Sequence, residues 1–274
     1  MEIKSSKYSK ELEVALKAAE KAGEVMDRYA EKKGFEDWDK EDGSVVTEAD
    51  IESQEKIVET IREEFPEDGF LGEEENLEPD GEDRVWIIDP IDGTFNFDSG
   101  FGFYCVSIAL EIDGEIVLGV VHLPESSMDR TYLGVENEGA YVFERGKKEA
   151  ENLEVSDHSE IEESLFFMTD FDIYEEELDW ELELLEKLAR KDATHRQVGS
   201  AAIEHCFLAE GRVDFLVNPI LKPWDYSAAK LIIEEAGGKV DVMESPFPDS
   251  ELVVASNGKI HEKITEIVEG IEAK

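Results

Sequence analysis

The sequence contains little positive charge, few cysteines and no long apolar run. Its 274 residues include 27 Lys and Arg against 70 Asp and Glu, so the formal net charge is −43. No apolar stretch approaches the ~20 residues of a membrane-spanning helix, and residues 1–10 contain no apolar signal-peptide segment. Two cysteines, Cys105 and Cys206, are too few for a disulfide framework. We therefore expect a cytoplasmic protein that is neither secreted nor inserted in a membrane.

The excess of acidic residues is spread along the whole chain rather than gathered in one tail. Such a surface repels the phosphates of nucleic acids and anionic membranes, so we expect neither as a partner. Salt screens the repulsion, because the Debye length falls from about 8 Å at 0.15 M to about 3 Å at 1 M. The composition therefore indicates a halophilic protein from a salt-rich cytoplasm. The alternative is an unusually acidic protein that needs no added salt.

Hydrophobic residues make up 41% of the chain, which is enough for a core and argues against disorder. In the first part, apolar residues recur at helical spacing over 12–29 and 47–65. Strand-like runs then follow at 85–88, 103–110, 116–122, 131–135 and 140–143. Asp113-Gly114 is a hairpin signal between two of them, which predicts an antiparallel meander.

After about residue 150 the pattern changes to alternating strands and helices. The expected strands are 164–168, 213–217 and 252–255, and the expected helices lie near 175–190, 200–210, 225–236 and 259–272. This alternation is typical of an α/β arrangement. Since no Pro- or Gly-rich linker intervenes, we expect a single folding unit over 1–274, with an N-terminal α+β half (1–150) and a C-terminal α/β half (151–274).

The segment 86–97, Trp-Ile-Ile-Asp-Pro-Ile-Asp-Gly-Thr-Phe-Asn-Phe, is the most informative for function. A buried strand ends in two carboxylates, Asp89 and Asp92, while Gly93 allows close backbone approach and Thr94 adds a hydroxyl. Mg²⁺ prefers oxygen ligands and often keeps water and substrate phosphate in its other positions. Exposed backbone N–H groups beside the acids suit a phosphate. The segment predicts a metal-plus-phosphate site; the alternative is a solvated acidic turn at a strand end.

Several motifs occur in the order and at the spacing of one known family. They are Gly-Glu-Glu at 72–74, Asp-Pro-Ile-Asp-Gly-Thr at 89–94, Val-Gly-Ser-Ala-Ala at 198–202, Trp-Asp at 224–225 and Glu-Ala-Gly-Gly at 235–238. Through them the chain resembles, over essentially its whole length, the inositol monophosphatase family of Mg²⁺-dependent, lithium-sensitive phosphatases. The resemblance implies the mixed α/β fold shared with fructose-1,6-bisphosphatase, a layered αβαβα sandwich, and commonly a homodimer.

The resemblance also implies the site residues and their roles. The implied metal ligands, for two or three Mg²⁺ ions, are the carboxylates of Glu73, Asp89, Asp92 and Asp225 and the backbone carbonyl of Ile91. Glu73 and Thr94 would orient and deprotonate the attacking water, with Asp50 behind Thr94 and supporting a weaker metal. The implied substrate contacts are Asp92, Gly93, Thr94, Gly199, Ser200, Ala201, Asn218 and Asp225.

The chemistry agrees with these roles, because paired metals activate water and neutralise the charge of a phosphomonoester. A purely structural role stays open at several positions. Asp50 stands three residues after Thr47, as in a capping box at the start of a helix, and Glu74 is an alternative to Glu73. Asp225 could also be only a helix N-cap, and Gly199 and Ser200 could be a plain helix start. The histidines, which show no metal-ligand spacing, are expected at the surface or in packing: His122, His158, His195, His205 and His261.

Departures from the family pattern concern the substrate. Inositol-selective members carry a Glu seven residues before the Asp of the Trp-Asp motif, where this chain has Asn218. Asn still hydrogen-bonds a hydroxyl but lacks the charge. Residues 95–97, Phe-Asn-Phe, resemble archaeal members that dephosphorylate both inositol phosphates and fructose 1,6-bisphosphate. Lys222 either reaches a second phosphate or is a surface lysine, and Lys230 replaces a frequent Gly.

We therefore expect an enzyme, a Mg²⁺-dependent phosphomonoesterase for inositol phosphate and/or fructose 1,6-bisphosphate. One alternative on the same fold removes a phosphate from 3′-phosphoadenosine 5′-phosphate or from NADP. The haloacid dehalogenase class fits less well, because its Asp-x-Asp-Gly-Thr motif is one residue shorter than the 89–94 motif. A catalytically silent metal-binding protein is the non-enzyme alternative.

Overall fold

The computed structural model describes residues 7–31, 37–39, 45–74, 77–79, 81–147, 149–168 and 175–271. The helices are α1 (Ser9–Ala30), α2 (Glu48–Arg62), α3 (Thr94–Ser99), α4 (Glu175–Ala189), α5 (Ala201–Ala209), α6 (Pro223–Glu235) and α7 (His261–Glu269). The strands are β1 (Asp37–Asp39), β2 (Val45–Thr47), β3 (Gly69–Gly72), β4 (Arg84–Asp92), β5 (Cys105–Ile112), β6 (Glu115–Leu123), β7 (Arg130–Val135), β8 (Gly139–Glu144), β9 (Glu151–Asn152), β10 (Leu165–Met168), β11 (Thr194–Arg196), β12 (Phe215–Leu221), β13 (Lys239–Glu244) and β14 (Glu251–Ser256).

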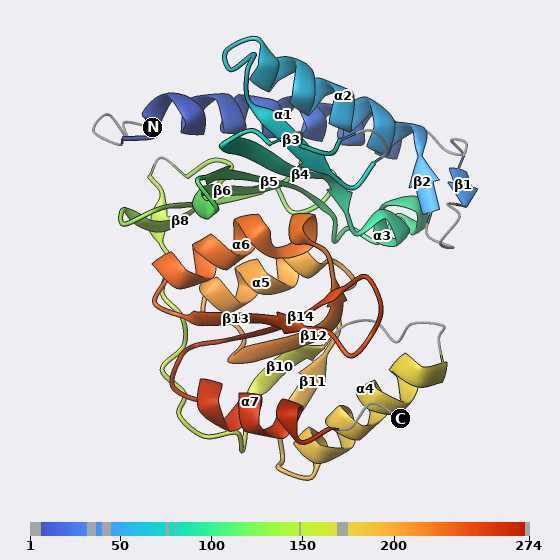
Figure 1. Ribbon diagram of the computed structural model, residues 1–274, viewed down its shortest axis with the longest axis vertical. Coiled ribbons are helices and arrows are strands. Elements are labelled where there is room, and N and C mark those ends of the chain that lie inside the picture. The colour runs from blue at the N-terminus through green and yellow to red at the C-terminus, as the bar shows by residue number, and fades with distance from the viewer. Residues whose placement is uncertain are drawn as a thin grey trace.

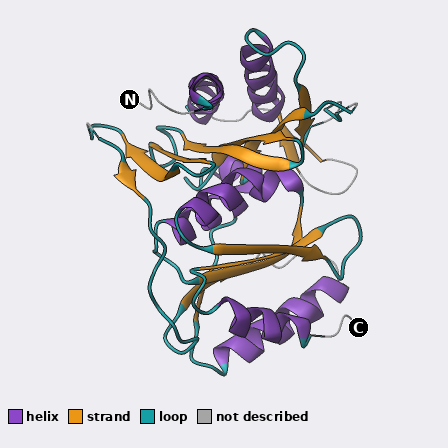
Figure 2. Cartoon of the chain, turned by 60° about the vertical axis from the view of Figure 1, so that its left-hand side comes forward, coloured by secondary structure: helices purple, strands orange, loops and turns teal. Residues whose placement is uncertain are grey.

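These elements stack in five layers of alternating helices and sheets (Figures 1 and 2). Helices α1 and α2 cover one face of the first sheet, and α5 and α6 lie between its other face and the second sheet (Figure 1). Helices α4 and α7 form the last layer. The prediction of a layered αβαβα sandwich is confirmed. Within the described part of the chain, no helix has both the length and the apolar character required to span a bilayer.

The first sheet has the strand order β3-β4-β5-β6-β7-β8-β9, and its neighbours from β4 onward are antiparallel. The predicted meander is therefore confirmed. Its β5–β6 turn is formed by Asp113 and Gly114, which both have positive φ angles (55° and 83°). This conformation matches the twist of the flanking strands, and Asp and Gly tolerate it.

The second sheet has the order β11-β10-β12-β14-β13, in which the β10 pairings are parallel and the others antiparallel. Two elements that position the site were missed by the sequence pattern: the short strand β3, parallel to β4, and helix α3 directly after the Asp-Gly-Thr motif. Strand β3 has four residues, two of them Gly, which is too short and too Gly-rich to show a strand pattern.

Helix α6 packs unusually close to the first sheet because two glycines of the sheet leave room for it. A Cβ atom placed on Gly119 in β6 would lie 2.3 Å from the backbone oxygen of Ala228. A Cβ on Gly134 in β7 would lie 3.1 Å from the Cα of Ile232. The two glycines therefore set how closely α6 approaches the sheet. They also set the position of Asp225, which lies in the first turn of this helix.

Candidate functional site

The end of β4 places two buried carboxylates next to each other. All residues of this strand after Arg84 are buried, and Asp89 and Asp92 retain only 2% and 7% of their exposure. The pairing of β4 with β5 shifts register between these two acids, where Pro90 has no N–H to donate to the ladder. The irregularity turns the chain so that Asp89 Oδ1 accepts the Ile91 N–H at 3.0 Å.

Asp92 is bound by the N-terminal end of helix α5, from the other half of the chain. Its carboxylate accepts hydrogen bonds from Ser200 Oγ (2.5 Å) and from the backbone N–H groups of Ala201 (3.1 Å) and Ala202 (2.8 Å). Cys105 donates its thiol proton to the same oxygen as Ser200, at 3.5 Å. A helix N-terminus favours a negative group. Ser200, expected to face the substrate, thus holds Asp92.

Five acids converge on this region, from β4, α2, α6 and the segment directly after β3. Burial and then the charges of the surrounding acids raise the pKa of Asp89 well above its ordinary value; the acids are Glu73, Asp92, Asp225 and Asp50. Burial raises the pKa of Asp92 to about 6, although the hydrogen bonds from Ser200 and α5 oppose this shift. Burial also raises the pKa of Asp225. Neutralisation by a cation would relieve this crowding of negative charge.

The hydroxyl of Thr94 lies between two groups of the predicted site. Its Oγ1 is 3.0 Å from the Ile91 carbonyl oxygen and 3.3 Å from Asp50 Oδ1. Asp50 is fully buried in the first turn of α2. The side chain of Thr47, the other member of the expected capping box, lies outside the described residues. Thr94 can therefore pass a proton to Asp50 while accepting one from a bound water.

We expect Thr94→Val to lower kcat by about 10²–10⁴-fold, because it removes the hydroxyl that contacts Asp50 and keeps the side chain's volume. Steady-state phosphate release checks this. Thr94→Ser retains the hydroxyl and is the matched control, which should keep most of the activity. A Thr94→Val enzyme with the kcat of the unaltered protein would contradict the role of the hydroxyl.

Gly93 sits in a position that no larger residue can take. Its φ is +88°, and a Cβ atom there would lie 2.8 Å from the Phe103 carbonyl oxygen and 3.1 Å from the Cβ of Ser200. The residue is the N-cap of helix α3. Its backbone therefore packs tightly between the segment that leads into β5 and the start of α5, directly after Asp92.

The sequence patterns missed the role of Asn96. Its side-chain Nδ2 lies 2.8 Å from the carbonyl oxygens of both Phe103 and Val198 and 3.1 Å from that of Gly199. It therefore ties α3 to the segment that leads into α5. The sequence did contain a sign of this role, because Asn96 stands between two aromatic residues. An amide that is buried with such neighbours needs hydrogen-bond partners.

A match to a known family accompanies this geometry. The model of the inositol monophosphatase family matches residues 7–273 of the 274. The chain belongs to the inositol monophosphatase family.

Individual relatives agree with this membership. The chain is 33% identical over 266 residues to "Fructose-1,6-bisphosphatase/inositol-1-monophosphatase" of Thermotoga maritima, with 94% of this chain and 95% of the relative covered. It is 36% identical over 235 residues to "Histidinol-phosphatase" of Chlorobaculum parvum, with 83% and 84% covered. The solved structure of an IMPase from Thermotoga maritima is similar with a TM-score of 0.81 at 32% identity, covering 95% of this chain and 97% of that one.

In this inositol monophosphatase family member, two of the expected site residues have a structural role at the start of a helix. Asp225 is the third residue of α6, and its Oδ2 accepts the Lys222 N–H at 2.6 Å, so it caps the helix. Its charge nevertheless raises the pKa of Asp89. Ser200 is the N-cap of α5 and also binds Asp92. The charge of Glu73 raises the pKa of both Asp89 and Asp225.

The donor set suits a hard cation, since every implied ligand is an oxygen. Among the described residues, no three His, Cys, Asp or Glu side chains are close enough together to hold one ion in this arrangement. Asp92 and Asp225 instead bind backbone N–H groups at helix starts. Because burial and mutual repulsion disfavour their charged forms, these carboxylates fit a divalent cation in composition and charge.

Two further features concern residues near the expected substrate contacts in the sequence. Asn218, in β12, is 1% exposed, and its Oδ1 has no hydrogen-bond partner among the described residues. A cavity of about 790 Å³ lies at the start of α6, between Leu71, the Lys222–Trp224 segment and the loop around Phe247. Asp89, Asp92 and Asp225 are not among the residues that line it. The Lys222 ammonium is bound to the Asp249 carbonyl oxygen.

The buried histidines of this family member take part in packing. His261, 1% exposed, connects Ser256 Oγ and Asp241 Oδ2, at 2.9 Å each. This resembles a catalytic Ser-His-Asp arrangement, but Ser256 is fully buried and its Oγ accepts the Gly258 N–H. The three residues therefore connect β13, β14 and α7. Burial lowers the pKa of His205 to about 4, so it stays neutral at pH 7.

Proposed function

We propose that this protein is a metal-dependent phosphomonoesterase acting on inositol phosphate and/or fructose 1,6-bisphosphate. The observation that carries the proposal is the convergence of buried acids at the end of β4 with the Thr94–Asp50 pair. Burial raises the pKa of the Cys105 thiol beside Asp92, which makes it a poor nucleophile and favours direct attack by water. Family membership and the phosphatase names of the relatives support the same reaction class.

The carboxylates of Glu73, Asp89, Asp92 and Asp225 and the Ile91 carbonyl would hold two or three Mg²⁺ ions. When bound, such ions supply a water of lowered pKa and neutralise the phosphate oxygens. Thr94 orients the attacking water and passes its proton toward Asp50. The backbone N–H groups of Gly93 and Thr94, at the start of α3, bind the phosphate.

The alcohol part of the substrate is proposed to meet Gly199, Ala201 and Asn218. The free Oδ1 of Asn218 is an acceptor for a substrate hydroxyl, and its neutral amide selects less strictly than a Glu would. The cavity at the start of α6 offers room for a larger alcohol. One relative is named histidinol-phosphatase, which makes an amino alcohol phosphate a further candidate. We propose a homodimer in a salt-rich cytoplasm, with the sugar or inositol phosphate as its small-molecule partner.

The test is phosphate release from inositol 1-phosphate and fructose 1,6-bisphosphate with Mg²⁺. We expect turnover of both, faster in molar KCl than in dilute buffer, because salt screens the −43 charge that repels the substrate. Histidinol phosphate and 3′-phosphoadenosine 5′-phosphate serve as competing substrates. Hydrolysis of the nucleotide alone would overturn the substrate class, and no hydrolysis of any of the four would overturn the enzyme. Full activity without added salt would overturn the halophilic proposal.

A further inference from the structure

Helix α5 is fixed to the first sheet at both of its ends. At its N-terminal end, Ser200, Ala201 and Ala202 donate hydrogen bonds to Asp92 of β4. Asp92 therefore caps a helix from the other half of the chain, in place of a side chain of that helix. Any movement of α5 along its axis would change the orientation of this carboxylate.

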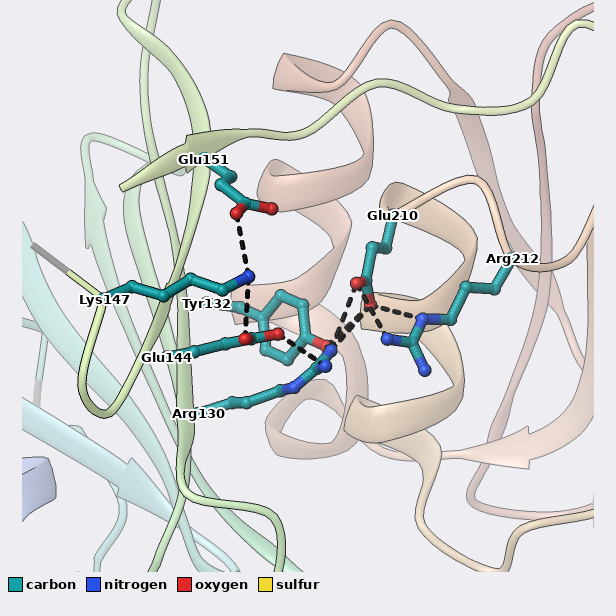
Figure 3. A network of polar contacts seen from close by, with 7 residues as sticks. All are labelled: Arg130, Tyr132, Glu144, Lys147, Glu151, Glu210 and Arg212. Atoms are coloured by element: carbon teal, nitrogen blue, oxygen red, sulfur yellow. Dashed lines mark hydrogen bonds and ion pairs between the residues drawn. The ribbon is translucent and has the colours of Figure 1, made fainter. Parts of the chain in front are cut away.

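At the C-terminal end, Glu210 is bound by residues of the same sheet (Figure 3). Its carboxylate accepts hydrogen bonds from Tyr132 (2.9 Å) and from Arg130 Nη1 (3.1 Å), both on β7. Arg212 binds the same carboxylate at 2.7 Å, and Arg130 also binds Glu144 of β8 at 2.5 Å. With Lys147 and Glu151, we call these residues the Arg130 cluster.

The Arg130 cluster stabilises Glu210 in an electrostatically unfavourable position. A negative charge at the C-terminal end of a helix opposes the helix dipole, and two guanidinium groups offset that repulsion. Tyr132 is fully buried, and Arg130 is only 17% exposed. The contact therefore lies within the interface of the two halves rather than on the surface, where ion pairs contribute little.

The body of α5 is rigid enough to connect its two ends. Every residue from Ala202 to Ala209 is buried, in a core shared with the first sheet, α6 and the second sheet. The helix is about 13–14 Å long, from its rise of about 1.5 Å per residue. Because a close-packed interior yields little locally, displacement of one end moves the helix as a unit.

We propose that Arg130 and Glu210 are positioning residues for Asp92, which they orient through α5. The proposal rests on the proposed function, in which Asp92 holds a metal ion. The Arg130–Glu210 contact fixes α5 along its axis, and its N-terminal N–H groups hold the Asp92 carboxylate in one orientation. Residues that orient a metal ligand contribute to ion affinity without touching the ion.

The test compares Arg130→Met and Glu210→Gln by Mn²⁺ binding, measured from the free-ion signal in electron paramagnetic resonance. Each substitution should weaken Mn²⁺ binding by about tenfold. In the ion-free protein, each should also speed hydrogen exchange of the Ala202 amide, the donor to Asp92. The double variant should bind Mn²⁺ as weakly as either single one, because the two residues act through one contact.

Two control variants separate positioning from stability. Lys147→Met alters the Arg130 cluster at Glu144 and Glu151, away from α5, and should leave Mn²⁺ affinity unchanged. Arg84→Met removes the ion pairs to Asp68 and Glu11 elsewhere on the first sheet; it should lower Tm without changing Mn²⁺ affinity.

The proposal is overturned if Arg130→Met and Glu210→Gln lower Tm yet keep the Mn²⁺ affinity and Ala202 exchange of the unaltered protein. Equal weakening by Lys147→Met would also overturn it, since charge alone would then explain the effect. Absence of Mn²⁺ binding by the unaltered protein would overturn the proposed metal site instead. The Ala202 exchange rates would still decide whether the cluster orients Asp92.

Discussion

Replacing Asp89 by Asn should abolish turnover and, at the same time, stabilise the ion-free protein. In the proposed site Asp89 is a charged metal ligand, and its loss is expected to lower kcat by at least about 10³-fold, or ~4 kcal/mol of transition-state stabilisation. The fold should persist, because Asn retains an oxygen at Oδ1 to accept the Ile91 N–H. Activity and stability should therefore change in opposite directions.

The stability gain follows from the sign of the pKa shift. Burial and the neighbouring acids raise the pKa of Asp89 in the folded state, so its ionised form opposes folding above the pKa of the unfolded chain. That cost starts to shrink when the pH falls below the folded-state pKa, and it is gone below the pKa of the unfolded chain; Asn removes it at every pH. Each kcal/mol gained raises Tm by about 2–4 °C in a chain of this size.

Thermal unfolding with and without Mg²⁺, beside phosphate release, measures both effects. Asn218→Asp is the opposite control, because it adds a carboxylate at a buried position and should lower Tm in the absence of the ion. If Asp89→Asn is less stable than the unaltered protein when both lack Mg²⁺, repulsion among the acids does not destabilise the folded state, and the prediction is contradicted.

Gly119→Val is expected to have the largest effect away from the acids. The added Cβ would meet the Ala228 backbone oxygen at 2.3 Å, and backbone cannot move aside without displacing α6. We expect a loss of about 3 kcal/mol or more in the free energy of unfolding, or about 6–12 °C in Tm. Phosphate release at a temperature where the variant is folded should also fall, because α6 carries Asp225.

Gly270→Ala is the matched control for that substitution. It lies at the end of α7, far from the site, where a Cβ would have its nearest neighbours at ordinary contact distances of 3.4 Å or more. Its Tm and activity should stay near those of the unaltered protein. If Gly119→Val keeps the activity of the unaltered protein when both are folded to the same extent, the position of α6 does not affect catalysis.

The sequence predicts those parts of the site that are local in the chain. Asp89, Asp92, Gly93 and Thr94 are within six residues, so a buried strand followed by a turn was sufficient to bring them together. The hydrogen bonds from α5 to Asp92 join residues 108–110 positions apart. Apolar periodicity cannot predict contacts between residues so far apart. The roles of Ser200 and Asn96 could therefore be recognised only from the three-dimensional structure.

The same limit applies to the fold. The meander and the main helices follow from apolar periodicity and the Asp113-Gly114 turn. Strand β3 did not, because its conformation depends on its pairing with β4 rather than on its own four residues. The close approach of α6 depends on Gly119 and Gly134, whose missing side chains have meaning only once the helix facing them is known.

The acids are divided between the two halves of the chain. Asp50, Asp89 and Asp92 come from the first sheet and its helices, whereas Asp225 comes from α6. Neither half holds all four acids, so either half produced alone would lack part of the proposed site. A change in the packing between the halves, such as a side chain added at Gly119, would move Asp225 relative to the other three acids.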